Sequence, residues 1–276
     1  MRGETQTGTI PVIPVGGPGT ERCGAPTARV PEGWILPMCG RFNVETSPLS
    51  RWLLEVLGVG HPGPDNHNAA PTEQIAVVRA GLLGDPETVR MRWWLTPHWS
   101  KELSTRYSMF NARRETLESS PAFREPFRRH RCLVPVSGFY EWTGKAPAKM
   151  PWYLRPRAEP GLLLAGIWDR WVDPAGTETV ESFAVVTTDA HPALRFVHSR
   201  QPVMLGLQGA KRWLDPAIDP AELRGLLEPV LPVDLDAVPV SSHVNNARHK
   251  DRRCIEPIAA SVPVGLDAAV DPERES

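Results

Sequence analysis

Residues 132–142 read CLVPVSGFYEW, and this stretch decides the class of fold. Its two apolar runs, Cys132–Val136 and Phe139–Trp142, are short and rich in β-branched and aromatic residues, so they predict strands. Further strands are predicted on both sides of it, at residues 75–79, 89–95, 162–168 and 183–188. A chain with so many short strand segments is predicted to be built around β-sheet.

The predicted helices are few and short. The first begins at Ser47-Pro48, with Ser as the N-cap and Pro as the first helical residue, and it ends at Gly58. The Gly-, Pro- and Asn-rich residues 60–71 then predict a loop. Other helices are predicted at residues 112–118, 192–197, 210–214 and 220–227. Because strands dominate and no β-α-β alternation repeats, we expect a single α+β domain around a curved, mostly antiparallel sheet.

The two ends of the chain differ from its middle. Residues 1–37 are rich in Gly, Pro and Thr and show no hydrophobic period, so we expect a disordered extension that is removed or never translated. The predicted domain covers residues 38–262, and residues 263–276 are expected to form a loose tail. No apolar run is long enough to predict a membrane span, and no secretory signal is recognisable at the start, which favours a cytoplasmic protein.

The charges are balanced over the whole chain, with 31 basic and 32 acidic residues, so the net charge does not indicate a nucleic-acid partner. Between Arg90 and Arg131, however, basic residues outnumber acidic ones and aromatic residues are interleaved. Such a segment can form a phosphate-binding groove with stacking surfaces, or it can simply be a solvated surface. The aromatic residues concerned are Trp93, Trp94, Trp99 and Phe110.

The cysteines indicate reactivity rather than metal binding. No two of the four cysteines have a Cys-x-x-Cys spacing, so no metal site is predicted, and Cys132 is expected to be a buried apolar residue. Cys39 directly follows Met38, and translation from Met38 would leave Cys39 with a free α-amine beside its thiol after removal of the methionine. An amine condenses with an aldehyde to an imine, and a neighbouring thiol can then close a thiazolidine ring. The alternative is a buried structural cysteine inside the chain.

Three further segments carry polar side chains suited to the same chemistry. Asn111 could orient a reacting group through its amide, or it could be a helix N-cap. Glu141 is expected to face away from its neighbours Tyr140 and Trp142, whose rings would desolvate it as a general acid; the alternative is a solvent-facing carboxylate. His198 could move a proton. Phosphate binding is suggested for Arg113 and Arg200, which lie in the same segments.

Together these motifs resemble the SRAP family, the SOS response-associated peptidases or abasic-site processing proteins. The resemblance runs from Met38 to about Ile258, and its motifs occur in the order of the family. They are MCGRF (38–42), RWWLTPHW (92–99), FNARRET (110–116), CLVPVSGFYEW (132–142), VHSRQPVML (197–205) and VNNARHKDRRCIEPI (244–258).

This resemblance implies a barrel-like sheet with a positively charged DNA cleft and no metal or organic cofactor. It implies that Cys39, as the N-terminal residue, links covalently to the ring-opened aldehyde of an abasic site in single-stranded DNA, and it associates peptidase and lyase activities with the family. The expected protein is a cytoplasmic monomer that joins the nucleoid at damaged DNA. By motif position, the catalytic residues are Cys39, Asn111, Glu141 and His198, and the DNA contacts are Arg41, Arg113, Arg200, Trp93 and Pro71.

Three features depart from the family pattern. Residues 1–37 place the amine of Cys39 in a peptide bond, Gln201 stands where Met is usual, and Trp94 stands where Gly is usual. Two other functions therefore stay open. One is a cysteine peptidase that cuts the Met38–Cys39 bond with the help of Glu141 or His198. The other is a non-covalent single-strand binder that keeps the extension.

Overall fold

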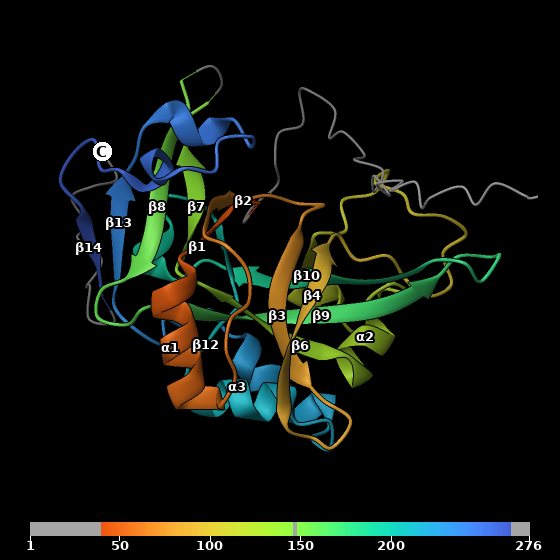
Figure 1. The fold of residues 1–276 in the computed structure, drawn as a ribbon. Coiled ribbons are helices and arrows are strands. Elements are labelled where there is room, and N and C mark those ends of the chain that lie inside the picture. The colour runs from red at the N-terminus through yellow and green to blue at the C-terminus, as the bar shows by residue number, and fades with distance from the viewer. Residues whose placement is uncertain (1–39, 146–147, 266–276) are drawn as a thin grey trace, which may run out of the picture. The chain divides into compact units, whose positions relative to one another are not determined.

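The computed structural model describes residues 40–145 and 148–265. Cys39, the extension before it and the tail from residue 266 lie outside this described part. Within it the strands form two sheets accompanied by short helices (Figure 1). None of the helices in the described part is long and apolar enough to cross a membrane.

The smaller sheet is antiparallel throughout its described strands. In its order β14-β13-β8-β7-β1-β2, the short strand β1 lies between β2 and β7 and pairs with both. The segment that follows the predicted nucleophile is therefore held on two sides. The strands are β1 (Phe42–Val44), β2 (Asn66–Ala69), β7 (Gly138–Thr143), β8 (Met150–Pro156), β13 (Leu235–Pro239) and β14 (Val262–Val264).

The larger sheet curves into a barrel. Its described strands are β3 (Gln74–Ala80), β4 (Pro86–Trp93), β5 (Asn111–Arg113), β6 (Arg131–Val136), β9 (Leu162–Val172), β10 (Thr179–Asp189), β11 (Arg200–Pro202) and β12 (Met204–Leu205). Most pairs are antiparallel, but β10 runs parallel to β4 and β5. Because β9 pairs with both β6 and β10, the strands β10-β4-β3-β6-β9 close on themselves. The predicted α+β class with a barrel-like, mostly antiparallel sheet is confirmed.

Side-chain alternation gives the barrel strands two apolar faces. One face packs against the smaller sheet in a shared core that includes Phe42, Trp93, Phe139 and Val185. The other face forms an outer core that is covered by helices, two of which, α1 and α3, lie below the strands in Figure 1. These helices are α1 (Thr46–Leu57), α2 (Arg124–Arg129) and α3 (Leu207–Leu214).

Most of the predicted strands are confirmed, with ends shifted by a few residues, and Cys132 is buried as expected. The first helix ends at Gly58 as predicted, with a left-handed φ of 75° that glycine adopts easily. Its predicted N-cap is wrong, because the helix begins two residues earlier, at Thr46, with Glu45 as the N-cap and no side-chain capping bond.

Two other predictions are wrong because long-range pairing outweighs local pattern. The helix expected at residues 112–118 is instead β5, paired with β10, followed by a single 3-10 turn, η1 (Arg114–Thr116). The loop expected at residues 60–71 contains β2, a polar strand with no visible hydrophobic alternation. The remaining 3-10 segments are η2 (Pro192–Leu194), η3 (Pro220–Leu227), η4 (Ser242–Asn245) and η5 (Arg252–Ile255). The last strand, β14, extends two residues past the domain end expected at residue 262.

Candidate functional site

The described chain begins at Gly40, next to one of the predicted catalytic residues. In the antiparallel pairing of β1 with β7, the N–H of Tyr140 donates a hydrogen bond of 3.0 Å to the carbonyl of Arg41. One residue further, this register places Gly40 opposite Glu141. Cys39 is the preceding residue in the sequence and lies outside the described residues.

Glu141 is a buried carboxyl group at the end of the shared core, with 4% of its surface exposed. It lies on the same face of β7 as Phe139, a member of that core, and the expectation that it faces away from Tyr140 and Trp142 is confirmed. The ring that shields Glu141 from water is therefore not that of Tyr140 or Trp142. It is that of Trp152, which is directly opposite Glu141 on β8. A carboxyl group shielded from water in this way is suited to proton transfer.

Asn111 approaches the same core from the barrel side. It opens β5 and is paired with Val185 of β10, whose side chain belongs to the shared core. The residue before it is also fixed, because the carbonyl of Phe110 accepts hydrogen bonds from the N–H of Val185 (3.0 Å) and from Nε1 of Trp93 (2.9 Å). The backbone therefore holds Asn111 in a defined position.

His198 lies between η2 and β11, and its ring orientation is set by a backbone contact. Its Nδ1 accepts a hydrogen bond of 3.1 Å from the N–H of Arg200, so the neutral imidazole carries its proton on Nε2. In the same segment, the ring of Phe196 packs edge-on against Trp152 at 5.7 Å. Since Trp152 is opposite Glu141, this contact brings the His198 segment to the part of the smaller sheet that carries Glu141.

The three described catalytic candidates thus border one core from three different directions. Glu141 belongs to the smaller sheet, Asn111 to the barrel, and His198 to the connection between β10 and β11. The acid and the imidazole can supply and remove protons during an addition to a carbonyl group, and the amide can orient the reacting group.

Arg41, a predicted phosphate contact, is buried and bonded within the chain. It is 6% exposed, and its guanidinium donates to Oδ1 of Asn68 and to the carbonyl of Val244, both at 2.9 Å. Burial lowers its pKa, against the raising effect of nearby Glu73 and other groups. The donors of Arg41 fasten the chain in this structure, and its role as a phosphate contact stays a prediction.

Asn68 is the centre of this arrangement, and the sequence did not single it out. Its side-chain amide nitrogen lies 3.0–3.1 Å from the carbonyl oxygens of Val244, Asn246 and His249, while its oxygen accepts from Arg41. The segment VNNARHK therefore serves as a clamp that holds β1 and β2 from outside. The only signal for this clamp in the sequence was that VNNARHK belongs to one of the family motifs.

The other two predicted arginines differ in how available they are. Arg113 is exposed at the end of β5, opposite Thr187. Arg200 has a side chain that is only 13% exposed and forms ion pairs with Glu115 at 3.0 Å and Asp189 at 3.2 Å. Arg113 is therefore the predicted arginine that is placed to meet a phosphate, whereas Arg200 would first have to give up its carboxylate partners.

Trp93 and Pro71 are buried, so neither offers an open stacking surface. The ring of Trp93 stacks on Phe42 of β1 with a centroid distance of 3.9 Å and an interplanar angle of 14°. The residue after Pro71, Thr72, has a φ of 79°, unusual for a β-branched residue, and its N–H donates to the carbonyl of Trp93 at 2.8 Å. Trp93 supports β1 from within the core, and its assignment to the DNA path stays a prediction.

The other interleaved aromatic residues divide in the same way. Trp94 and Phe110 are buried with ring centroids 5.2 Å apart, whereas Trp99 is 57% exposed. Only Trp99 of these described rings is free to stack on a base.

Gln201, which departs from the family pattern, is accommodated inside the protein. It is 1% exposed, accepts a hydrogen bond from the N–H of His191 at 2.8 Å, and donates to the carbonyl of Val230 at 3.0 Å.

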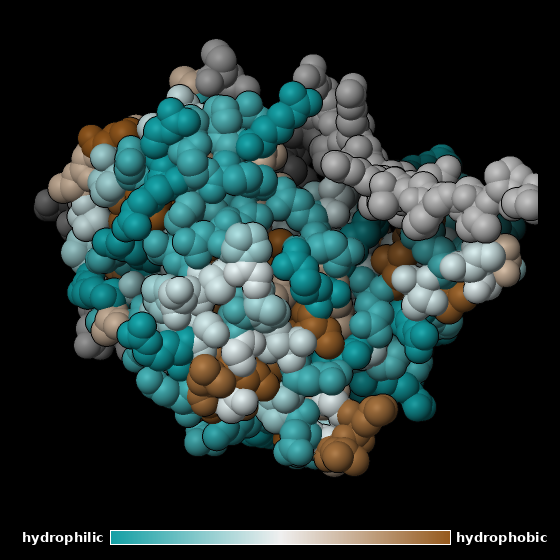
Figure 2. Space-filling model, in the orientation of Figure 1, coloured by the Kyte–Doolittle hydropathy of each residue, from teal (hydrophilic) through white to brown (hydrophobic). Residues whose placement is uncertain are grey.

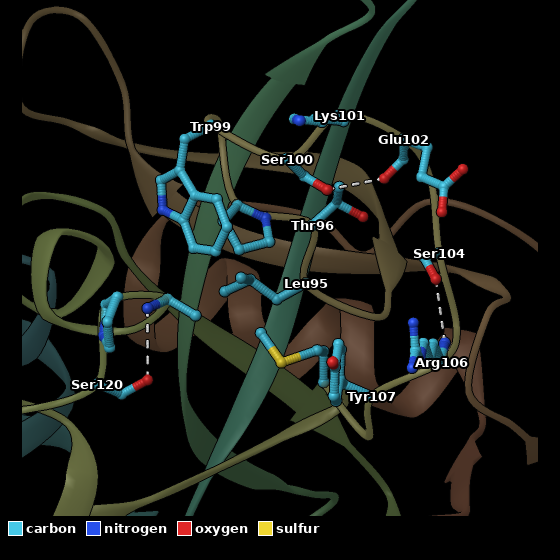
Figure 3. Close-up of a pocket in the computed structure, with 14 residues that line it drawn as sticks. Leu95, Thr96, Trp99, Ser100, Lys101, Glu102, Ser104, Arg106, Tyr107 and Ser120 are labelled. Carbon is cyan, nitrogen blue, oxygen red and sulfur yellow. Dashed lines mark hydrogen bonds between the residues drawn. The ribbon is translucent and has the colours of Figure 1, made fainter.

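A pocket of about 430 Å³ lies in the loop that connects β4 to β5 (Figure 3). The residues that line it include Leu95 of the outer core but none of the described catalytic candidates. Its rim carries Trp99, Lys101 and Arg106, the last with its guanidinium 5.7 Å from the ring of Tyr107. Figure 2 shows that the visible face of the molecule is mostly hydrophilic with small apolar patches.

A family model described as SOS response associated peptidase (SRAP) matches residues 38–247 of this chain. The chain belongs to the SRAP family. The matched range contains all the catalytic candidates, Cys39, Asn111, Glu141 and His198. The clamp formed by VNNARHK lies partly inside the matched range and continues beyond it.

Curated relatives and solved structures agree with membership in the SRAP family. The abasic site processing protein YoqW of Bacillus subtilis is 33% identical over 232 residues, which cover 79% of this chain and 99% of the relative. The abasic site processing protein HMCES of Gallus gallus is 32% identical and covers 64% of this chain and 60% of its own. A Bacteroides thetaiotaomicron protein of 24% identity shares the fold, with a TM-score of 0.67 over 79% of this chain and 99% of that one.

Proposed function

We propose that this SRAP protein binds single-stranded DNA and captures abasic sites covalently through Cys39, which shields the lesion during the response to DNA damage. The observation that carries the proposal is that Glu141, Asn111 and His198 border the shared core from three elements, with Glu141 opposite Gly40, where the described chain begins. The names of the relatives support abasic DNA as the partner.

The chemistry requires Cys39 to be the first residue. Its α-amine attacks the C1′ aldehyde of the ring-opened deoxyribose, and loss of one water molecule leaves an imine. The Cys39 thiol then adds to the imine carbon, its proton passes to the nitrogen, and a thiazolidine ring results. No electrons are gained or lost overall, so the reaction needs no redox partner.

Each described residue has a task in this scheme. Glu141, buried beside Gly40, protonates the departing hydroxyl so that it leaves as water, takes up the proton that the nitrogen loses, and later relays the thiol proton to the nitrogen. His198, with its proton on Nε2, assists opening of the sugar ring. Asn111, held by the pairing of β5 with β10, orients the sugar through its amide. Exposed Arg113 contacts a backbone phosphate and reads no sequence.

The decisive test compares three chains that all begin at residue 39, each verified by intact mass. They carry Cys, Ser or Ala at that position and are incubated with a single-stranded oligonucleotide that contains one abasic site. Cys should give a heat-stable adduct, whereas Ser and Ala, which keep the α-amine but lack the thiol, should give only an imine that survives after borohydride reduction. A chain that begins at Cys39 and forms no adduct would contradict the proposal.

The same experiment separates the two other functions. Expression of the full chain from Met1 shows whether residues 1–37 remain attached. Loss of the extension in the wild type but not in Cys39→Ala would indicate self-cleavage of the Met38–Cys39 bond. Retention of the extension together with salt-sensitive binding and no adduct would indicate a non-covalent single-strand binder.

A further inference from the structure

Two histidines share one buried carboxylate on the outer side of the barrel. Asp169 of β9 is 3% exposed, and its Oδ2 accepts hydrogen bonds from both the backbone N–H (2.8 Å) and Nδ1 (2.9 Å) of His98. Its Oδ1 accepts from the N–H of Arg170 at 2.8 Å and lies 3.8 Å from Nδ1 of His130. Within the described residues, no Lys or Arg side chain lies within ion-pair distance of Asp169, so imidazoles are its cationic partners.

The two histidines present different surfaces. The ring of His130 lies flat on Trp168 with a centroid distance of 4.5 Å, and Arg79, itself paired with Glu87 and Glu181, covers Trp168 at 4.7 Å. His98 is in a turn and has a side chain that is 55% exposed. Because its Nδ1 donates to Asp169, its Nε2 points away from the carboxylate.

In this geometry, whether Nε2 of His98 can donate a hydrogen bond depends on the charge of the ring. With Nδ1–H bonded to Asp169, a neutral ring has a bare lone pair on Nε2, which cannot donate to an anion. A protonated ring has Nε2–H, a charged donor held in a fixed direction by two bonds to one oxygen. Burial acts to raise the pKa of Asp169, but the His130 and His98 rings and the surrounding backbone N–H groups outweigh it and lower that pKa, which keeps the carboxylate ionised.

The surroundings of His98 match a nucleotide chain. The next residue, Trp99, is 57% exposed, and Lys101 and Arg106 follow on the rim of the pocket, opposed there by one acid, Glu102 (Figure 3). The loop is fastened at its base, because the N–H of Leu95 donates to the carbonyl of Met109 at 3.0 Å. Two residues after Met109 the chain reaches Asn111, so this loop continues directly into the catalytic region.

We propose that His98, oriented by Asp169, is a phosphate-binding residue for single-stranded DNA that passes over the β4–β5 loop, with its contact made only by the protonated ring. This assignment rests on the proposed function, since it needs DNA at the neighbouring site. Trp99 presents a stacking surface for a base, and His98 Nε2–H donates to the adjoining phosphodiester. Because only the charged ring can donate from Nε2, binding at this position is stronger at acid pH.

The test measures reversible binding in the full chain carrying Cys39→Ala, using a labelled oligothymidine and a salt titration at about pH 5.5 and about pH 8.5. Loss of one phosphate contact on single-stranded DNA lowers the slope of log K against log salt by about 0.7, or about five-fold in affinity at 0.1 M salt. His98→Gln should show this loss at the lower pH and little change at the higher pH. His130→Gln is the matched control, because it changes the second histidine beside Asp169 and leaves the His98 ring in place. It should keep the parent slope at the lower pH.

The outcomes distinguish this inference from the proposed function. If the parent binds the oligothymidine but His98→Gln leaves its slope unchanged at both pH values, the phosphate assignment is overturned alone. An equal loss at both pH values would also overturn it, because the contact would not depend on charge. If the parent shows no salt-sensitive binding, the proposed function fails together with it. His98→Gln removes one hydrogen bond to buried Asp169, so a lower melting temperature is expected, and a single cooperative thermal transition above the assay temperature checks that the variant is folded.

Discussion

Replacing Asn68 with Ala removes the centre of the clamp that holds the start of β1. Asn68 is fully buried, and its side chain accepts from Arg41 and contacts the carbonyls of Val244, Asn246 and His249. An amide nitrogen has two hydrogens, so two of the three carbonyls are bonded at a time. Alanine leaves these acceptors and one donor of a buried guanidinium without their partner.

The expected cost follows from these contacts. Two amide-to-carbonyl bonds contribute about 1 kcal/mol each, and the bond to charged Arg41 contributes about 1.5–3 kcal/mol. The free energy of unfolding should therefore fall by about 3–5 kcal/mol, a large part of the total of about 5–15 kcal/mol for a domain. Asn68→Asp should not restore it, because a carboxylate accepts from Arg41 but repels the three carbonyl oxygens.

Urea unfolding of the full chain, followed by tryptophan fluorescence, measures this difference. Asn245→Ala is the matched control, because Asn245 is exposed and accepts one bond, from Nε1 of Trp142 at 2.7 Å. It should cost less than about 1 kcal/mol. If Asn68→Ala costs no more than Asn245→Ala, the clamp does not stabilise the fold and the reasoning is refuted.

Three other perturbations test separate features. Arg113→Ala should lower the salt slope of single-stranded DNA binding by about 0.7 without changing the melting temperature, since the residue is exposed. Burial lowers the pKa of His61 to about 4, with Arg90 adding to the effect. As the pH falls, the unfolded chain therefore binds a proton at His61 before the folded chain does. The stability that neutral His61 contributes is present above about pH 6.5 and is lost toward pH 4. His61→Leu should therefore flatten the dependence of melting temperature on pH in that window. Gly138→Ala should destabilise by about 1–3 kcal/mol in urea unfolding, because its Cβ would lie 2.5 Å from the carbonyl oxygen of Leu154.

Much of the fold could be predicted from local pattern. The strand at residues 132–136 was visible because an uninterrupted apolar run suits a strand that is buried on both faces, and β6 is buried throughout. The end of α1 was visible because Gly58 adopts a left-handed conformation at little cost. By contrast, β2 is made of polar residues whose strand geometry comes from pairing with β1, so no local pattern could reveal it.

The family could also be predicted from the sequence, since the order of six motifs is a property of the chain itself. So could the chemistry of an N-terminal Cys39, which depends only on an amine and a thiol on one residue. The facing of Glu141 followed from the period of a strand, and the structure agrees. What supplies its burial did not follow, because the opposing ring belongs to Trp152 on another strand.

The availability of each predicted side chain was decided only by tertiary structure. Arg41 and Arg113 have the same chemistry in the sequence, yet Arg41 is fastened to Val244, 203 residues away, and Arg113 is exposed. Trp93 and Trp99 lie six positions apart, yet Trp93 supports the core and Trp99 is open to a base. Side-chain type and spacing determine which chemistry a residue can perform, but whether its polar or aromatic face is free depends on partners that are distant in the chain and meet only when the sheets close.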